Sequence, residues 1–340
     1  MDRTVCATLL TWFALVGCGE DAEKQDTGSS ATSTSESTTT GTSGSQGSTT
    51  ATTGSSSTTS TSPTTEDISA CLDPSTELLG VGEELTVNGV ARTYRVTVPA
   101  RDAGVPLPVL FAFHGGDEGH FGFPQQSLFD RLADEQGAIL IYPHAKLVDP
   151  NEGAWQLNTS EGYTQDTEFV EAMIDELRSR YCVDLKRLYA TGYSLGSMFT
   201  YELPCHMSGR FAAVASHAGT MPVVPYSCDM EDPVAVMHLH GRSDWIIDYN
   251  EPWDWKEWDY VGTMMDVPSL VDFWGDKNTC ASVDEAVSSG FMHITHDDCD
   301  GAVRVEHYAL DGQGHDWPMS VDGVSTHQLI WDFVSGFSKP

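Results

Sequence analysis

One stretch near the middle of the chain limits the possible folds more than any other. A strand-like run, Arg187–Ala190, leads into a Gly-x-Ser-x-Gly turn, and a helix-like run, Met198–Met207, follows. Small residues two positions away on each side of a serine let strand and helix approach closely around a sharp, strained turn. Gly192 and Gly196 are these small residues. The spacing predicts a strand–turn–helix unit that exposes the hydroxyl of Ser194.

The predicted turn has the features of a nucleophile site. A helix that begins directly after a serine presents backbone N–H groups and a positive dipole end, which stabilise an oxyanion. Ser194 is therefore the candidate nucleophile, and the backbone N–H of Leu195 is a candidate oxyanion donor. We expect the second donor, Gly116, in the His114–Asp117 loop that follows an apolar strand. A plain Gly-Gly turn is the alternative interpretation of that loop.

Apolar runs of strand length alternate with amphipathic runs of helical length along most of the chain. Strands are expected at 109–113, 138–142, 187–190, 211–216, 234–240 and 303–310, and helices at 125–135, 169–181, 198–207, 269–274 and 326–337. Asn88-Gly89 between the alternating segments 84–87 and 90–98 predicts a β-hairpin. The pattern therefore predicts an α/β fold: a mostly parallel central sheet with helices on both faces and an N-terminal antiparallel hairpin.

The partners of the serine are expected in loops at one edge of this sheet, because loops after the carboxyl ends of parallel strands gather there. Asp244 and His315 each follow an expected strand downstream of Ser194. The order Ser, Asp, His is that of α/β-hydrolases. We therefore expect Asp244 to orient His315, and His315 to take the proton of Ser194.

Other polar residues near these loops have simpler explanations. Asp232 and Asp248 flank the same strand as Asp244, but an aspartate after a strand is often only a turn former. His238 and His240 alternate along that strand, which is compatible with a metal site, although such histidines are more often satisfied within the core. No metal and no cofactor is expected.

Aromatic residues are dense beside the expected site. The segment 245–259 directly follows Asp244 and is rich in tryptophan. Rings at such a position predict a wall for a planar acyl group or a sugar ring. Trp155, Trp245 and Trp317 are the candidate substrate-binding residues, and packing of these rings onto the domain is the alternative.

The N-terminal segments predict export and anchoring. An apolar stretch follows Arg3 and ends in Leu-Val-Gly-Cys at Cys18, the pattern of a bacterial lipoprotein signal, with a secretory signal as the alternative. A region of Ser, Thr and Gly comes next, which cannot form a core. We expect a signal peptide at 1–17, a disordered linker at 18–66 and a catalytic domain at 67–340. Lipid on Cys18 would hold the catalytic domain outside the cytoplasm, at the bacterial cell surface or outer membrane.

The cysteines fit an exported protein. Six cysteines remain once Cys6 and Cys18 are set aside, and an even number in an exported chain predicts three disulfides. Cys280 and Cys299 are expected to pair because they are near each other in the sequence. The other four can pair in three ways, which the sequence leaves open.

Several segments in order resemble the secreted poly(3-hydroxybutyrate) depolymerase and feruloyl esterase family, with acetylxylan esterases nearby. They are Val90–Tyr94, Phe113–Gly116, Ala190–Gly196, His240–Asp244 and Gly314–Pro318, and the likeness covers 71–340. The resemblance implies an α/β-hydrolase with Ser194, Asp244 and His315 at the triad positions. The chain departs from the pattern at Ser197, where a second glycine is usual, after Gly116, and in the segment around Cys71.

Together these features predict a lipid-anchored serine esterase that acts on feruloyl or acetyl esters of plant polysaccharide. A poly(3-hydroxyalkanoate) depolymerase is the alternative within the same class. A surface binding protein that keeps the fold without turnover is the alternative from another class. The formal net charge of -33 repels nucleic acid, so a nucleic-acid partner is not expected.

Overall fold

A computed structural model describes residues 69–116, 119–149, 152–159, 164–255 and 262–340. The expected signal peptide, its lipidation site Cys18 and the expected linker lie outside these residues, so they stay predictions. Within the described ranges, no helix combines the length and the apolar character that crossing a membrane requires.

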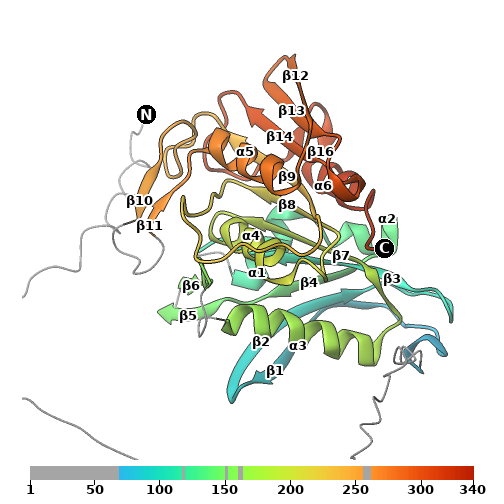
Figure 1. Ribbon diagram of the computed structural model, residues 1–340. Coiled ribbons are helices and arrows are strands. Elements are labelled where there is room, and N and C mark those ends of the chain that lie inside the picture. Colours follow the sequence, from blue (N-terminus) through green and yellow to red (C-terminus); the bar gives the residue numbers. More distant parts are fainter. Residues whose placement is uncertain (1–68, 117–118, 150–151, 160–163, 256–261) are drawn as a thin grey trace, which may run out of the picture. The chain divides into compact units, whose positions relative to one another are not determined.

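A ten-stranded sheet in the order β1-β2-β4-β3-β7-β8-β9-β14-β13-β12 forms the centre (Figure 1). Its strands are β1 Leu78–Val87, β2 Val90–Val98, β3 Leu107–Phe113, β4 Ile139–Pro143, β7 Val183–Tyr193, β8 Ala213–His217, β9 Ala235–Gly241, β12 Ser282–Ser288, β13 Phe291–Asp297 and β14 Val305–Leu310. The strands from β4 to β14 in this order run parallel. Antiparallel strands extend the sheet at both edges. The predicted mostly parallel sheet is confirmed.

The predicted N-terminal hairpin is also confirmed. Val87 pairs with Val90, and the two residues between them have positive φ angles, 50° at Asn88 and 81° at Gly89. A two-residue turn of this kind matches the right-handed twist of the strands it joins. The first strand begins at Leu78, six residues earlier than the alternation of the sequence indicated, and an irregularity in register lies between Leu78 and Val81.

Helices cover both faces of the sheet. They are α1 Gly119–Ser127, α2 Arg131–Gln136, α3 Gln165–Arg180, α4 Leu195–Met207, α5 Val267–Lys277 and α6 Thr326–Val334. Apolar side chains of α3, α4 and α5 join one core, and those of α1, α2 and α6 join another on the opposite face. The helix expected at 125–135 is divided in two, because Leu128 adopts a φ of 61° between α1 and α2.

Several short elements were not predicted. They are the 3-10 turns Ser69–Cys71 and Asp300–Ala302 and the two-stranded pairs β5 Lys146–Asp149 with β6 Glu152–Ala154, β10 Trp253–Trp255 with β11 Gly262–Met264, and β15 Ser320–Val321 with β16 Val324–Ser325. The β12–β13 hairpin was missed as well. Most of β12 is exposed and polar, so it lacks the apolar alternation that identifies a half-buried strand.

Three disulfides link Cys71 to Cys182, Cys205 to Cys228 and Cys280 to Cys299. The last is the pair expected from proximity. The first ties the segment before β1 to the residue that precedes β7, and so gives a structural role to the N-terminal departure from the family pattern.

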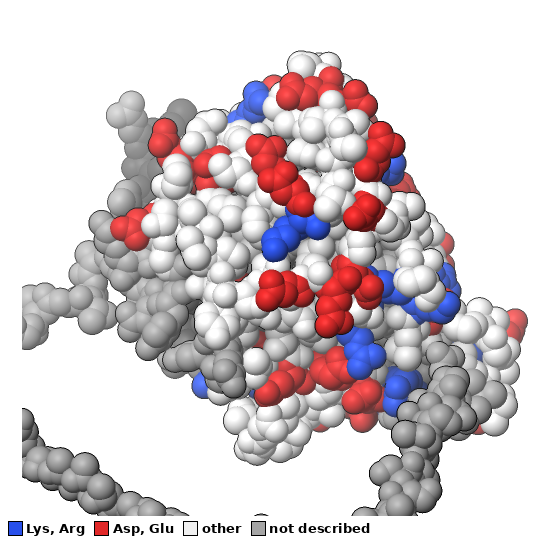
Figure 2. Space-filling view, in the orientation of Figure 1, with Lys and Arg blue, Asp and Glu red and all other residues white. Residues whose placement is uncertain are grey.

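Acidic side chains spread over the face of the domain in Figure 2 and do not gather in one patch. This distribution agrees with the excess of 50 Asp and Glu over 17 Lys and Arg in the whole sequence. Lys and Arg side chains lie among the acidic ones in the same view, but an acidic excess of this size repels polyanions.

Candidate active site

Ser194 lies at the strained turn between β7 and α4. Its backbone has φ 54° and ψ -119°. Residues other than glycine rarely adopt such a positive φ angle. A Cβ atom on Gly192 would lie 2.2 Å from the carbonyl oxygen of Gly196, and one on Gly196 would lie 2.2 Å from that of Phe113. Both positions therefore require glycine, as the spacing of the motif predicted.

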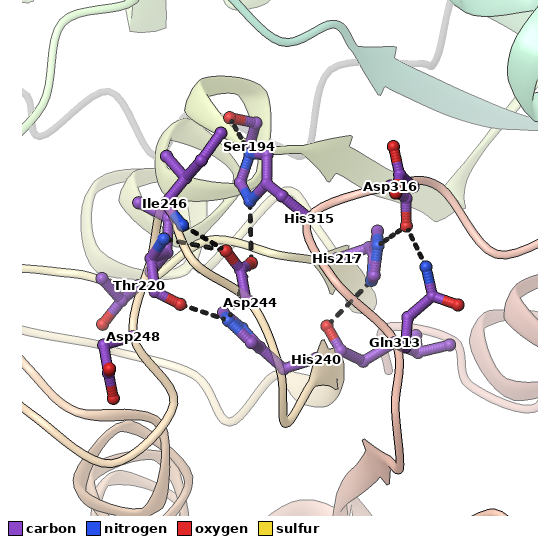
Figure 3. Close-up of polar contacts among 12 residues, drawn as sticks. Ser194, His217, Thr220, His240, Asp244, Ile246, Asp248, Gln313, His315 and Asp316 are labelled. Carbon is purple, nitrogen blue, oxygen red and sulfur yellow. Dashed lines mark hydrogen bonds and ion pairs between the residues drawn. The ribbon is translucent and has the colours of Figure 1, made fainter. Parts of the chain in front are cut away.

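The three residues predicted to act together do meet at one edge of the sheet. His315 Nε2 lies 2.9 Å from Ser194 Oγ, and His315 Nδ1 lies 2.7 Å from Asp244 Oδ2. Figure 3 shows the His315 ring between the serine hydroxyl and the carboxylate. Asp244 and His315 are buried, whereas Ser194 is partly exposed. The arrangement can abstract a proton from the hydroxyl and hold the resulting imidazolium beside a carboxylate.

The Asp244 carboxylate is held from several sides. Its Oδ1 accepts hydrogen bonds from the backbone N–H groups of Ile246 and Ile247, each at 2.9 Å. Its Oδ2 faces His315 and, at 3.2 Å, Nε2 of His240. Burial by itself would raise the pKa of this carboxyl, but the hydrogen bonds from His240 and His315 outweigh burial and hold the pKa well below its ordinary value. Asp244 is therefore ionised at neutral pH.

The loops that carry Asp244 and His315 are joined by backbone contacts. Arg242 N–H donates to Leu310 O at 2.8 Å, and Ser243 N–H donates to Gln313 O at 3.0 Å. A Cβ atom on Gly241 would lie 2.2 Å from Gln313 O, so only glycine permits this approach. The distance between carboxylate and imidazole is thus set by the backbone of both loops.

Two side chains from neighbouring strands hold the His315 loop, and sequence reasoning missed both. The hydroxyl of Tyr193 donates to the carbonyl of His315. His217 lies with Nε2 3.0 Å from the carbonyl of Asp316. The signal available in the sequence was their position at the carboxyl ends of two expected strands, one residue before Ser194 and one residue beyond the apolar run 211–216.

The His114–Gly116 loop lies beside the nucleophile. A Cβ atom on Gly115 would be 3.4 Å from Ser194 Cβ, and one on Gly116 would be 3.3 Å from Leu195 Cδ1. His114 Nε2 accepts from Ala145 N–H at 3.1 Å, so its Nδ1 carries the proton and donates to Gly115 O at 2.6 Å. These bonds hold the loop, with the predicted oxyanion donor Gly116, beside Ser194 and Leu195.

The structure corrects the predicted roles of two tryptophans. Trp155 is only 2% exposed and packs between Phe113 and Phe199, because β3 and α4 both present aromatic side chains to it. Its Nε1–H donates to His114 O at 3.0 Å, so Trp155 anchors the loop and does not form an open wall. Trp317, 7% exposed, is buried against Phe123, Phe129 and Tyr193.

Trp245 is the predicted aromatic residue that remains accessible. Its side chain is 74% exposed and directly follows Asp244 in the chain. A Cβ atom on Gly314 would lie 3.9 Å from Trp245 Cδ1, which places the indole beside the residue that precedes His315. Of the other tryptophans in the segment 245–259, Trp258 and the side chain of Trp255 lie outside the described part of the chain.

The remaining candidates have structural roles. Asp248 accepts from the N–H groups of Asn250 at 2.7 Å and Glu251 at 3.0 Å, so it caps a turn. Ser197 is buried, and its hydroxyl hydrogen-bonds to that of Ser216 on β8. The ring nitrogens of His238 and His240 all lie within hydrogen-bond distance of protein groups. Among the residues that the structure describes, no group of His, Cys, Asp and Glu could hold a metal ion.

The known proteins that this chain resembles include several esterases. The family model described as "Putative esterase" matches residues 87–287. The chain is 34% identical over 260 residues to "Probable feruloyl esterase C" of Aspergillus clavatus, and the alignment covers 72% of this chain and 85% of that protein. It is 29% identical over 247 residues to the bifunctional acetylxylan esterase/xylanase XynS20E of Neocallimastix patriciarum, and this alignment covers 73% of this chain.

The chain spans only 33% of the length of that bifunctional protein. Among solved structures, the acetyl xylan esterase from Aspergillus awamori superposes with a TM-score of 0.56 at 15% identity, over 75% of this chain and 99% of that one. At this identity the superposition shows a common fold.

Proposed function

Because the chain belongs to the esterase family, we propose that it is a carboxylic ester hydrolase that acts through an acyl-enzyme on Ser194, with feruloyl or acetyl esters of plant polysaccharide as substrates. The observation that carries the mechanism is the pair of distances around His315, 2.9 Å to Ser194 Oγ and 2.7 Å to Asp244 Oδ2. The strained backbone of Ser194 supports the same assignment, since such strain gathers at reactive residues.

The proposed reaction has two halves. Ser194 Oγ forms a bond to the ester carbonyl carbon while its proton passes to His315 Nε2, and the N–H groups of Leu195 and Gly116 hold the oxyanion. Collapse of this intermediate breaks the bond to the alcohol oxygen, which takes the proton from His315. Water then attacks the acyl-enzyme in the same way, giving its proton to His315, and the acid leaves as Ser194 recovers a proton. Asp244 stays ionised throughout.

The substrate class rests on two supports. Relatives that match most of this chain are called feruloyl and acetylxylan esterases. Trp245, 74% exposed beside the proposed triad, offers an indole face against which a phenolic acyl group or a sugar ring can stack. A hydroxyalkanoate polyester remains the alternative substrate, since a flat aromatic surface also adsorbs apolar polymer.

A rate comparison tests the mechanism and the substrate class together. We expect hydrolysis of methyl ferulate, p-nitrophenyl acetate and acetylated xylan at rates above that of a hydroxybutyrate oligomer. Ser194→Ala is expected to lower kcat by about 10⁴-fold or more. Ser197→Ala is the matched control, because it also removes a serine hydroxyl from the start of α4, and we expect its kcat within about twofold of the wild type. Equal rates for wild type and Ser194→Ala would remove the mechanism.

The binding-protein alternative is tested without a substrate. A fluorophosphonate reacts with an activated serine and leaves an inactive hydroxyl alone. We expect one covalent label on the folded, oxidised protein, located at Ser194 by peptide mass. An unlabelled protein that still binds polysaccharide would favour a fold retained for binding only.

We propose further that the mature chain is an exported lipoprotein: 1–17 is removed, Cys18 carries the lipid, 18–66 is a tether and 67–340 is the catalytic domain. The three disulfides support an oxidising compartment, where such bonds persist. In a bacterial host, radiolabelled palmitate should be incorporated by the wild type and not by Cys18→Ala. Equal incorporation by both would contradict the anchor and leave the enzymatic proposal untouched.

A further inference from the structure

A row of buried hydrogen bonds runs behind the proposed triad and ends on its carboxylate. Tyr201 Oη of α4 lies 2.6 Å from His238 Nδ1 on β9, and His238 Nε2 lies 3.0 Å from His240 Nδ1. His240 Nε2 lies 3.2 Å from Asp244 Oδ2. Figure 3 shows the His240 ring on the side of the Asp244 carboxylate away from His315. The first three residues of this row are 1% exposed or less, so water does not complete their hydrogen bonding.

The positions of the acceptors determine where each proton lies. His240 Nε2 faces two acceptors, the carbonyl of Ile247 at 3.0 Å and the carboxylate of Asp244 at 3.2 Å, so this nitrogen carries a proton. In the neutral ring, His240 Nδ1 is then an acceptor, and His238 Nε2–H donates to it. His238 Nδ1 is an acceptor in turn, and the Tyr201 hydroxyl donates to it. All the donors point toward Asp244.

Electrostatics agree with a neutral His238 ring and a protonated Tyr201 phenol. Burial lowers the pKa of His238 well below its ordinary value, and the neighbouring His240 and His307 lower it further. Burial also raises the pKa of Tyr201 well above its ordinary value, so its hydroxyl stays a donor. His307 and Tyr249 hold β9 in place at His238. His307 Nδ1–H donates to His238 O at 3.0 Å, and the Tyr249 hydroxyl donates to His307 Nε2 at 2.9 Å.

We propose that His240 is a positioning residue for Asp244, and that Tyr201 and His238 hold it in the one tautomer that can donate to the carboxylate. This inference rests on the proposed function of the triad. In the other tautomer the Nε2 lone pair would face the carboxylate and the Ile247 carbonyl, which repels both. With the donor in place, Oδ2 of Asp244 is aimed at His315 Nδ1–H, and His315 Nε2 is left unprotonated toward Ser194.

The role of His240 can be separated from mere packing by two substitutions at one site. In His240→Gln the side-chain amide nitrogen can reach the place of Nε2 and donate to Asp244. In His240→Asn the amide reaches only the place of Nδ1, so the donor to Asp244 is lost while a polar group stays buried. His327→Asn on α6 is the control for replacing a buried histidine away from the site, and we expect its kcat within about twofold of the wild type.

We expect His240→Asn to lower kcat on p-nitrophenyl acetate by about 10- to 100-fold with KM within about twofold, as for other residues that orient a reacting group. His240→Gln should retain at least about a third of the wild-type kcat. Equal kcat values for the Asn and Gln variants would overturn the proposal. Ser194→Ala distinguishes the cases: if it is inactive while His240→Asn is fully active, only this inference fails.

A substitution at Tyr201, the far end of the row, tests the tautomer of His240. This experiment also tests the proposal if His240→Asn does not fold. Tyr201→Phe removes the donor to His238 and frees both rings to reverse. We expect kcat to fall by about 3- to 10-fold in the wild-type background and to change by less than about twofold in the His240→Gln background. The Gln amide has no tautomer, and the two acceptors at this position, Ile247 O and Asp244 Oδ2, keep its NH2 group turned toward them. Equal losses in both backgrounds would show that Tyr201 acts through packing and would overturn the tautomer assignment.

Discussion

Mild acid should destabilise this domain strongly, because several histidines are buried in the neutral form. Burial, the largest cause, lowers the pKa of His217 and of His307 from 6.5 to about 3, and it lowers that of His238 in the same direction. In the unfolded chain each imidazole regains its ordinary pKa. Between these two values the unfolded state binds the additional protons, so the free energy of unfolding falls as the pH falls.

The magnitude follows from the shifts. At pH 5.0 each group lies about 1.5 pH units below its unfolded value of 6.5, which costs about 2 kcal/mol per group at about 1.4 kcal/mol per unit. His217 and His307 together would cost about 4 kcal/mol, with a slope near 3 kcal/mol per pH unit, and His238 acts in the same direction. A whole domain is stable by only about 5–15 kcal/mol.

Urea unfolding of the oxidised protein at pH 7.5 and at pH 5.0 measures this loss. His307→Gln, which removes one of the groups, should reduce the slope by about 1.4 kcal/mol per pH unit. The variant itself is expected to be less stable at pH 7.5, because Tyr249 and His238 O lose the ring between them. A change below about 2 kcal/mol between the two pH values would show that the buried rings are not held neutral, and would refute the reasoning.

The two tryptophans with opposite exposure should respond in opposite ways. Trp155→Phe removes one buried hydrogen bond and part of a packed ring, so it should lower the free energy of unfolding by about 2–4 kcal/mol and lower kcat by loosening the oxyanion loop. Trp245→Ala should change the free energy of unfolding by less than about 0.5 kcal/mol and raise KM for methyl ferulate. Unchanged stability in Trp155→Phe would contradict its role in the core, and an unchanged KM in Trp245→Ala would contradict its contact with substrate. Replacing Cys71 and Cys182 together by serine opens a loop with a sequence separation of 111 residues and should cost about 2–5 kcal/mol, and unchanged urea unfolding would contradict that role.

Features that depend on local spacing were predictable from the sequence. The Gly-x-Ser-x-Gly turn dictates its own geometry, since the backbone of Gly196 approaches the carbonyl of Phe113 too closely for any other residue. The Asn88-Gly89 pair dictates a two-residue turn because both positions need a positive φ angle. The gathering of Ser194, Asp244 and His315 follows from parallel strands, which end at a common edge.

Features that depend on which side chains meet across the core were not predictable. Trp155 and Trp245 look equally suitable as substrate contacts in the sequence, yet only packing against Phe113 and Phe199 removes one of them from the surface. Two of the three disulfide pairings also depend on long-range contact, and spacing does not distinguish them. The edge strand β12 lacks an apolar face, so its place in the sheet comes from pairing with β13 alone.

The histidines of β9 connect site geometry with stability. Their alternation placed His238 and His240 on one face of a strand, but the sequence did not show that Tyr201 of α4 would lie opposite them. His238 must be neutral to accept from Tyr201 through Nδ1 while it donates to His240, and the burial that keeps it neutral also makes the fold sensitive to acid. Replacing His238 by an apolar residue would remove one source of acid sensitivity and release the tautomer of His240. A variant stabilised in this way at pH 5.0 should therefore lose turnover, so greater acid stability and an ordered Asp244 are in opposition at this position.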